Sequence, residues 1–156
     1  MKKLISGALT AVLLVPGTAS AAVAYQGGII KNDSYGYRVK TTASIEKAIR
    51  DKKVVVVKNK DVKSKYGYIT RKGTFSLYYK VKGQDQMLVN LEYEPKKLSK
   101  AVFKREVGYG TYLGVRGNKT YYYVLPTGPV EGALGNARIE KLINDVPSMM
   151  KTFRLR

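Results

Sequence analysis

Residue types that commonly carry catalysis are scarce in this sequence. None of its 156 residues is histidine or cysteine, which excludes Ser-His-Asp and Cys-His nucleophile systems and the usual zinc and haem-histidine sites. Glu92 and Glu94 stand two residues apart, a spacing that places paired carboxylates on one face of a strand, as glycosidases require. Because they directly precede Pro95 amid many lysines, we interpret them as a solvated face neutralised by neighbours such as Lys80. We therefore predict a non-enzymatic protein with no catalytic residue, metal or cofactor. The alternative is a histidine-free ribonuclease that uses lysine, arginine and tyrosine.

The segment VGYGTYLGVRGNKTYYYVLP, residues 107–126, concentrates the aromatic side chains that could bind a ligand. Its Gly117-Asn118 pair is typical of a two-residue hairpin turn, because both residues tolerate a positive φ. That turn pairs Arg116 with Lys119. Carrying the register along the hairpin puts Tyr122 beside Leu113 on the predicted core face.

The same register places Tyr121 and Tyr123 over strand glycines on the opposite face. Tyrosine rings with a cationic rim can stack on bases or sugars and neutralise phosphate or carboxylate groups. The alternative is that the C-terminal helix packs on this glycine face, which would make both tyrosines core residues. Tyr78, Lys80 and Lys82, on the polar face of their own predicted strand, could extend the surface. The candidate ligand-binding residues are Tyr112, Arg116, Lys119, Tyr121, Tyr123, Tyr78, Lys80 and Lys82.

An export signal is predicted at the N-terminus. Two lysines precede an apolar run over residues 4–15, and small residues follow. We expect cleavage after residue 21, with residue 24 as the alternative, and no membrane span after processing because the run is too short. Removal of residues 1–21 takes away two lysines and no acidic residue, which leaves 27 basic against 11 acidic residues and a net charge of +16. A secreted or cell-envelope protein of bacterial origin is thus predicted, with affinity for polyanions.

Alternating and β-branched patterns predict several strands in the mature chain. Residues 22–34 are expected to form a flexible lead-in. Strands are predicted at 35–40, 54–57, 65–71, 74–81 and 86–93, with 54–57 an interior strand buried on both faces. Pairing Val81 with Met87 places both apolar sets on one face and sets Leu77 opposite Leu91.

Two segments carry a helical pattern. Hydroxyl residues at 41–44 precede an amphipathic stretch that continues to residue 53, and Asn136 can cap a helix that Pro147 ends or kinks. Residues 96–106 fit either a short helix or a strand. Two similar segments, SYGYRVK at 34–40 and KYGYITRK at 65–72, indicate either a duplicated strand or a chance repetition.

These patterns predict a single α+β domain over residues 35–156. We expect a twisted antiparallel sheet of about six or seven strands, with a partly closed barrel as a variant, one short helix and a C-terminal helix. The predicted function is a secreted, basic binding protein that associates electrostatically with an anionic polymer or surface, such as cell envelope, polysaccharide or nucleic acid. The alternative is a secreted inhibitor or toxin that binds a protein target through the tyrosine-rich face.

Overall fold

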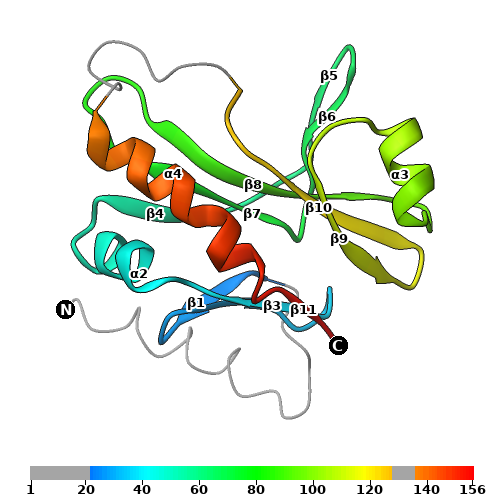
Figure 1. The fold of residues 1–156 in the computed structure, drawn as a ribbon, viewed down its shortest axis with the longest axis horizontal. Coiled ribbons are helices and arrows are strands. Elements are labelled where there is room, and N and C mark those ends of the chain that lie inside the picture. Colours follow the sequence, from blue (N-terminus) through cyan, green and yellow to red (C-terminus); the bar gives the residue numbers. More distant parts are fainter. Residues whose placement is uncertain (1–21, 128–135) are drawn as a thin grey trace, which may run out of the picture.

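The structure, a computed structural model, describes residues 22–127 and 136–156. The predicted signal segment and nearly all of the predicted loop at 127–135 lie outside these residues. The described residues form an α+β fold with three helices and three antiparallel sheets (Figure 1). The helices are α2 (Ala43–Arg50), α3 (Lys100–Glu106) and α4 (Ala137–Met150).

The strands divide into sheets of four, five and two, so the described residues form neither the predicted sheet of six or seven strands nor a closed barrel. The N-terminal sheet has the order β1 (Ala24–Gln26), β2 (Ile29–Asn32), β3 (Tyr37–Lys40), β11 (Arg154–Leu155). The central sheet has the order β4 (Val54–Lys58), β7 (Phe75–Tyr79), β8 (Gln86–Glu94), β10 (Lys119–Val124), β9 (Thr111–Arg116). A separate β5–β6 ribbon contains β5 (Val62–Ser64) and β6 (Gly67–Thr70).

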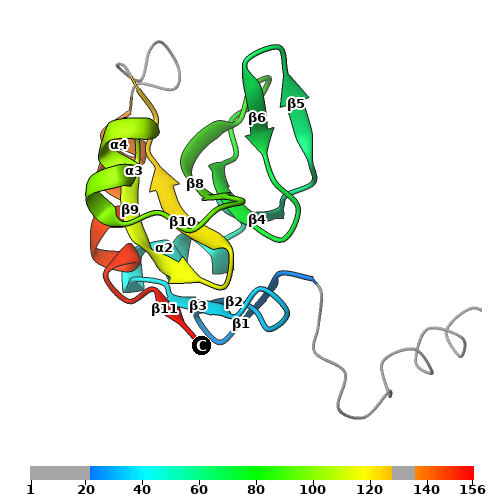
Figure 2. The same ribbon diagram turned by 90° about the vertical axis from the view of Figure 1, so that its right-hand side faces the viewer.

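The core lies between the central sheet, the N-terminal sheet and helices α2 and α4 (Figures 1 and 2). Its fully buried members come from every one of these elements, including Ile30, Val39, Ile45, Leu91 and Ile139. A smaller second core forms where α3 covers the other side of the β9–β10 hairpin, around Leu98, Phe103 and Tyr122. Burial in two places therefore holds together a chain that has no disulfide.

Side-chain caps begin all three helices. Thr42 accepts from the Ile45 amide, Ser99 from the Val102 amide, and Asn136 from the Ile139 amide at 2.9 Å, which confirms the predicted cap of the C-terminal helix. Helix α4 continues through Pro147 to Met150, so of the two alternatives for this proline, an end or a kink, the end is wrong. The ambiguous segment at 96–106 contains helix α3.

Several sequence-based assignments differ from the structure. The lead-in at 22–34 contains the β1–β2 hairpin, and β11 was not expected. The predicted interior strand β4 is an edge strand with Val57 exposed. Strand β5, at Val62–Ser64, lies between two predicted strands in a segment for which no strand was predicted.

Both predicted hairpin registers differ from the structure, and each pair contains one bulge. In the β7–β8 pair the predicted register is wrong throughout, because Leu77 lies opposite Val89 rather than Leu91 and the single shift lies between Leu77 and Tyr78. In the β9–β10 pair, Arg116 lies opposite Lys119 as predicted, but a shift after Tyr121 brings Tyr122 opposite Tyr112. An inserted residue changes which side chains share a face, and alternation in the sequence does not reveal it.

Tyr37 joins the two main sheets. Its ring stacks on Phe153 with centroids 5.7 Å apart and packs against Phe75 and Tyr121. Its hydroxyl donates to the carbonyl oxygen of Gly73 at 2.8 Å, inside the protein. The side chain of Asn32 donates to the same oxygen at 3.2 Å. The end of the N-terminal sheet is thereby bonded to the backbone that enters β7.

The substitution Tyr37→Phe tests this connection. The ring contacts stay, but the buried Gly73 carbonyl loses one of its two donors, so we expect the free energy of unfolding to fall by about 1 kcal/mol in urea titrations. Tyr66→Phe is the matched control, because that side chain is 87% exposed, and it should change stability by less than about 0.5 kcal/mol. Equal effects of the two changes would contradict a structural role for the Tyr37 hydroxyl.

Candidate functional site

The tyrosines predicted to form an open aromatic face are buried. Tyr121 is 1% exposed and Tyr123 is 7% exposed, and both belong to the main core. The Tyr121 ring packs 6.0 Å from that of Phe153, and a Cβ atom placed on Gly114 would lie 3.2 Å from a methyl group of Leu155. The C-terminal segment therefore covers Gly114 and Tyr121, and both tyrosines are packing residues.

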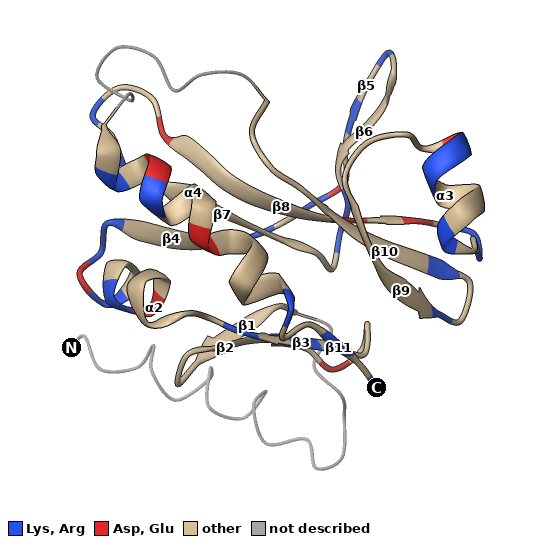
Figure 3. Cartoon of the chain, viewed as in Figure 1, with Lys and Arg blue, Asp and Glu red and all other residues tan. Residues whose placement is uncertain are grey.

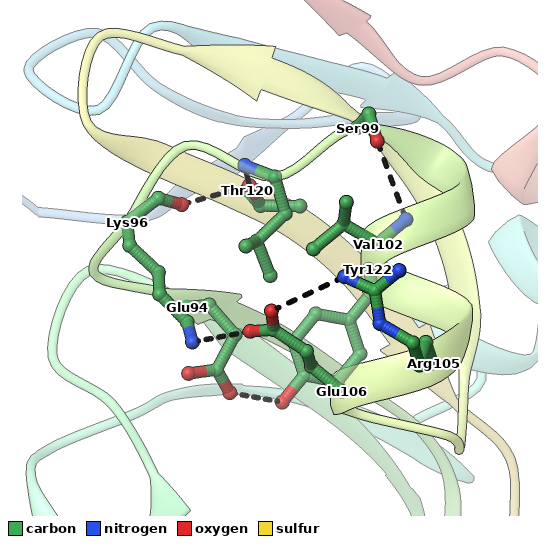
Figure 4. A network of polar contacts seen from close by, with 9 residues as sticks. Glu94, Lys96, Ser99, Val102, Arg105, Glu106, Thr120 and Tyr122 are labelled. Atoms are coloured by element: carbon green, nitrogen blue, oxygen red, sulfur yellow. Dashed lines mark hydrogen bonds and ion pairs between the residues drawn. The ribbon is translucent and has the colours of Figure 1, made fainter.

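Tyr112 belongs to the second core, where α3 is fixed against the sheet. Its ring lies 5.7 Å from Phe103, and its hydroxyl donates to the Leu98 carbonyl at 3.3 Å. Polar contacts surround this core (Figure 4). Lys96 pairs with Glu106 at 2.7 Å, and the Tyr122 hydroxyl donates to Glu94 at 3.3 Å. Tyr122 is buried, and Tyr112 is half-buried against α3.

The remaining predicted residues do not come together. Arg116 packs over Gly36 and donates from Nε to the Arg156 carbonyl. Tyr78, Lys80 and Lys82 lie near the opposite end of β8 from the β9–β10 turn, because β7 and β10 both pair with β8 in antiparallel fashion. There Lys80 forms an ion pair with Asp85 at 2.7 Å. Only Lys119 of the predicted set lies on an accessible surface where cations and aromatic rings alternate.

That surface contains three cations and three tyrosines from distant parts of the chain. Lys119 Nζ lies 5.4 Å from the ring centroids of both Tyr35 and Tyr93, whose own centroids are 6.0 Å apart. The Arg71 guanidinium carbon lies 5.2 Å from the Tyr93 centroid and 4.0 Å from that of Tyr68. Lys63 Nζ then lies 4.8 Å from the Tyr68 centroid. We call these residues the cation–aromatic row: Lys119, Tyr35, Tyr93, Arg71, Tyr68 and Lys63.

Backbone geometry at Gly73 positions the row. Gly73 has φ +87°, and a Cβ atom there would lie 2.3 Å from the Tyr35 ring, so only glycine lets that ring pack on the backbone. Tyr35 is thereby held beside Tyr93. The backbone N–H of Asn59 donates to the Thr74 carbonyl at 3.0 Å. This bond closes the base of the β5–β6 ribbon, which carries Lys63 and Tyr68.

The cations of the row form no direct ion pair with an acid in the described residues. Every residue of the row is half-buried or exposed. The ion pairs of residues 22–127 and 136–156 involve none of Lys63, Arg71 and Lys119. Residues 58–72, which contain the ribbon, hold six basic side chains and one acidic side chain. Basic positions occur on the ribbon, on α3 and around the β9–β10 turn (Figure 3). The row can therefore attract a polyanion while its rings offer stacking surfaces.

Glu92 is buried, so the expectation of a solvated carboxylate face neutralised by Lys80 is wrong for this residue. It is 5% exposed and accepts a hydrogen bond from the Asn90 side chain. Burial raises the pKa of Glu92 to about 7, although the Asn90 hydrogen bond and the charge of Arg71 oppose the rise. The carboxyl can hold a proton near neutral pH. The residues that line five surface hollows in the described part of the chain do not include Glu92.

Glu92 closes a polar network under the ribbon. The Asn59 side chain donates to Asn90 at 3.0 Å, and Ser76 donates to Asn90 at 2.7 Å. The Asn90 amide nitrogen donates in turn to the Ile69 carbonyl of the ribbon at 3.3 Å. The network attaches the ribbon to β7 and β8, so its hydrogen bonds serve structure.

Sequence reasoning found Lys119 and missed the other five residues of the row, which are Tyr35, Tyr93, Arg71, Tyr68 and Lys63. The two YGY segments were the available signal, because each supplies one tyrosine of the row, Tyr35 and Tyr68. Their convergence depends on strand pairings far apart in the sequence.

Comparisons with family models, curated proteins and solved structures find no match for this chain. In the residues that the structure describes, no cluster of acidic side chains could hold a metal ion. Of the helices in this part of the chain, none has the length and apolar character to cross a membrane.

The buried Glu92 predicts a specific dependence of stability on pH. Its folded-state pKa of about 7 lies above the ordinary 4.5, so folding favours the protonated form. The corresponding stability is fully present below about pH 4.5 and is lost as pH rises through 7. We expect Glu92→Gln to remove this decline, on the order of 2 kcal/mol after allowance for solvent screening, in denaturation curves recorded from pH 4.5 to 8.

Glu140→Gln, on the exposed face of α4, is the control and should retain the decline of the unmodified chain. A Glu92→Gln protein with an unchanged pH profile would contradict the assignment of the buried proton to this carboxyl.

Proposed function

We propose that this chain is a secreted, strongly basic, non-enzymatic protein that attaches electrostatically to an anionic polymer or surface through the cation–aromatic row. The observation that carries the proposal is the continuous alternation of cations and tyrosines over three separate parts of the fold. Secretion follows from the predicted signal at residues 1–21.

The contacts within the row support binding rather than stability alone. A surface cation–π contact contributes only about 0.5–1 kcal/mol to stability. Such contacts alone therefore do not explain why so many like charges lie together. The ribbon and its flanks carry four basic residues, Lys63, Lys65, Arg71 and Lys72. Their positive charges repel one another, and a bound polyanion would relieve this repulsion. The cations keep outward donors for phosphate, sulfate or carboxylate groups, and the rings limit their side-chain motion before binding.

The alternative function, a protein effector that binds through Tyr121 and Tyr123, is less favoured. Both side chains are buried in the main core, and exposing them would disrupt the contacts with Phe153 and Tyr37. Tyrosine contributes to protein interfaces when its ring is accessible. The accessible tyrosines lie instead among lysines and arginines.

The salt dependence of binding to a single-stranded oligothymidylate, used as a probe polyanion, tests the proposal. We expect affinity measured by fluorescence anisotropy to fall linearly in log–log form as salt rises, because bound cations release counterions. Arg71→Gln combined with Lys119→Gln should reduce the slope by about 1.4, since each single-strand phosphate contact contributes about 0.7.

The matched control is Arg138→Gln combined with Lys141→Gln, which removes the same two charge types from exposed positions on α4. It should leave the slope within about half a unit of the unmodified protein. Affinity that does not change with salt, or equal slopes for the two double variants, would exclude the row as the binding surface.

A further inference from the structure

Exposed apolar side chains gather on one short stretch of the chain. Six large hydrophobic side chains are exposed in the described residues, and five of them lie between residues 57 and 69. A solvent-exposed isoleucine or tyrosine is unremarkable alone, but a contiguous group usually marks an interaction surface. The five are Val57 (37%), Val62 (45%), Tyr66 (87%), Tyr68 (37%) and Ile69 (56%).

The β5–β6 ribbon that carries most of them projects away from the rest of the molecule (Figures 1 and 2). All but one of its strand residues are exposed. An isolated two-stranded ribbon is only marginally stable in water. Here its base is fixed by Thr70, whose hydroxyl donates to the Lys60 carbonyl at 2.6 Å, and by Asp61, which accepts from the Lys72 amide at 2.8 Å. The ribbon is thus held in place while its apolar side chains face water.

Basic residues surround the apolar side chains. Residues 58–72 carry a net charge of +5, from six basic residues and Asp61. Lys65 Nζ lies 4.8 Å from the Tyr66 ring centroid, which places a cation and an aromatic ring together at the ribbon tip. Asp61 is engaged by the Lys72 amide at the base of the ribbon, away from the tip.

We propose that the ribbon docks on an anionic lipid bilayer, with Tyr66 and Ile69 in the boundary between headgroups and acyl chains. This inference rests on the proposed function and names lipid as the anionic surface. Tyrosine favours the membrane interface, and lysine can bury its aliphatic stem while its ammonium group reaches the headgroups. Each basic residue close to an anionic membrane adds roughly fivefold to binding.

The aliphatic members of the group favour lipid over a polymer. Sugars and bases stack on flat rings, and Tyr66 and Tyr68 would suit them. Val62 and Ile69 offer no flat face, yet both are about half exposed. Hydrocarbon is the partner for which aliphatic and aromatic side chains are equally suited. The row at the base of the ribbon would then contact headgroups through Arg71 and Lys119.

Tryptophan fluorescence gives a direct test, because the chain contains no tryptophan. The variant Tyr66→Trp places a single indole at the ribbon tip, and Tyr109→Trp places one at a residue that is 56% exposed and outside the ribbon. Each protein is mixed with vesicles of equal parts phosphatidylglycerol and phosphatidylcholine, with acyl chains either unlabelled or brominated. We expect a blue shift and quenching by bromine for Tyr66→Trp and neither change for Tyr109→Trp.

The variant that combines Tyr66→Ser with Ile69→Ser separates lipid insertion from charge. It keeps every basic residue and all six residues of the row. We expect its partitioning onto the same vesicles in sedimentation to fall tenfold or more, while its oligothymidylate affinity stays within twofold of the unmodified protein.

Each other outcome has a defined meaning. Vesicle binding without bromine quenching at the ribbon tip, or equal quenching at both tryptophan positions, would overturn lipid docking by the ribbon. Oligothymidylate binding without vesicle binding would overturn the lipid inference and leave the proposed function standing. Failure to bind either probe would overturn both.

Discussion

The Gly73 carbonyl oxygen is the point on which both the core and the candidate surface depend. It accepts from Tyr37 and from Asn32, so the N-terminal sheet is bonded to the strand that enters the centre of the molecule. The same residue carries the Tyr35 ring on its bare Cα atom. A glycine is needed here both for its positive φ and for the space that a Cβ atom would occupy. One backbone position therefore fixes how the two sheets meet and where the cation–aromatic row begins.

Alternation in the sequence predicted the strands better than their partners. The β9–β10 turn, the Asn136 cap and the α+β class all follow from local residue chemistry, and the structure has them. Tyr121 lies opposite Gly114 and on the other face from Tyr122, as predicted, but the main core lies on the Tyr121 face. Tyr122, which was predicted for the main core, packs with Phe103 of α3 in the second core. Local alternation separates the two faces of a strand but does not show which elements will cover each face.

The sequence predicted a basic, aromatic surface but not which residues would form it. Net charge and the abundance of tyrosine indicate a basic aromatic surface, and Lys119 is common to the predicted and observed sites. Tyr93 and Arg71 were assigned to ordinary strands because nothing adjacent to them in sequence distinguishes them. They become neighbours only when β8 extends past the end of β7 and the chain leaving the ribbon folds over the exposed edge. Spatial convergence of separate strands is set by the whole fold.

The ribbon leaves and re-enters the central sheet at a single point, where the Asn59 amide meets the Thr74 carbonyl. A segment whose two ends already touch can change in length at little cost, because doubling a closed loop costs only about 0.6 kcal/mol. The ribbon tip, at residues 62–68, lies beyond the hydrogen bonds of Asp61 and Ile69, so it can vary in length while the polar network below it stays intact. The fold thus separates its packed core from an exposed segment whose tip tolerates insertions at little cost to stability.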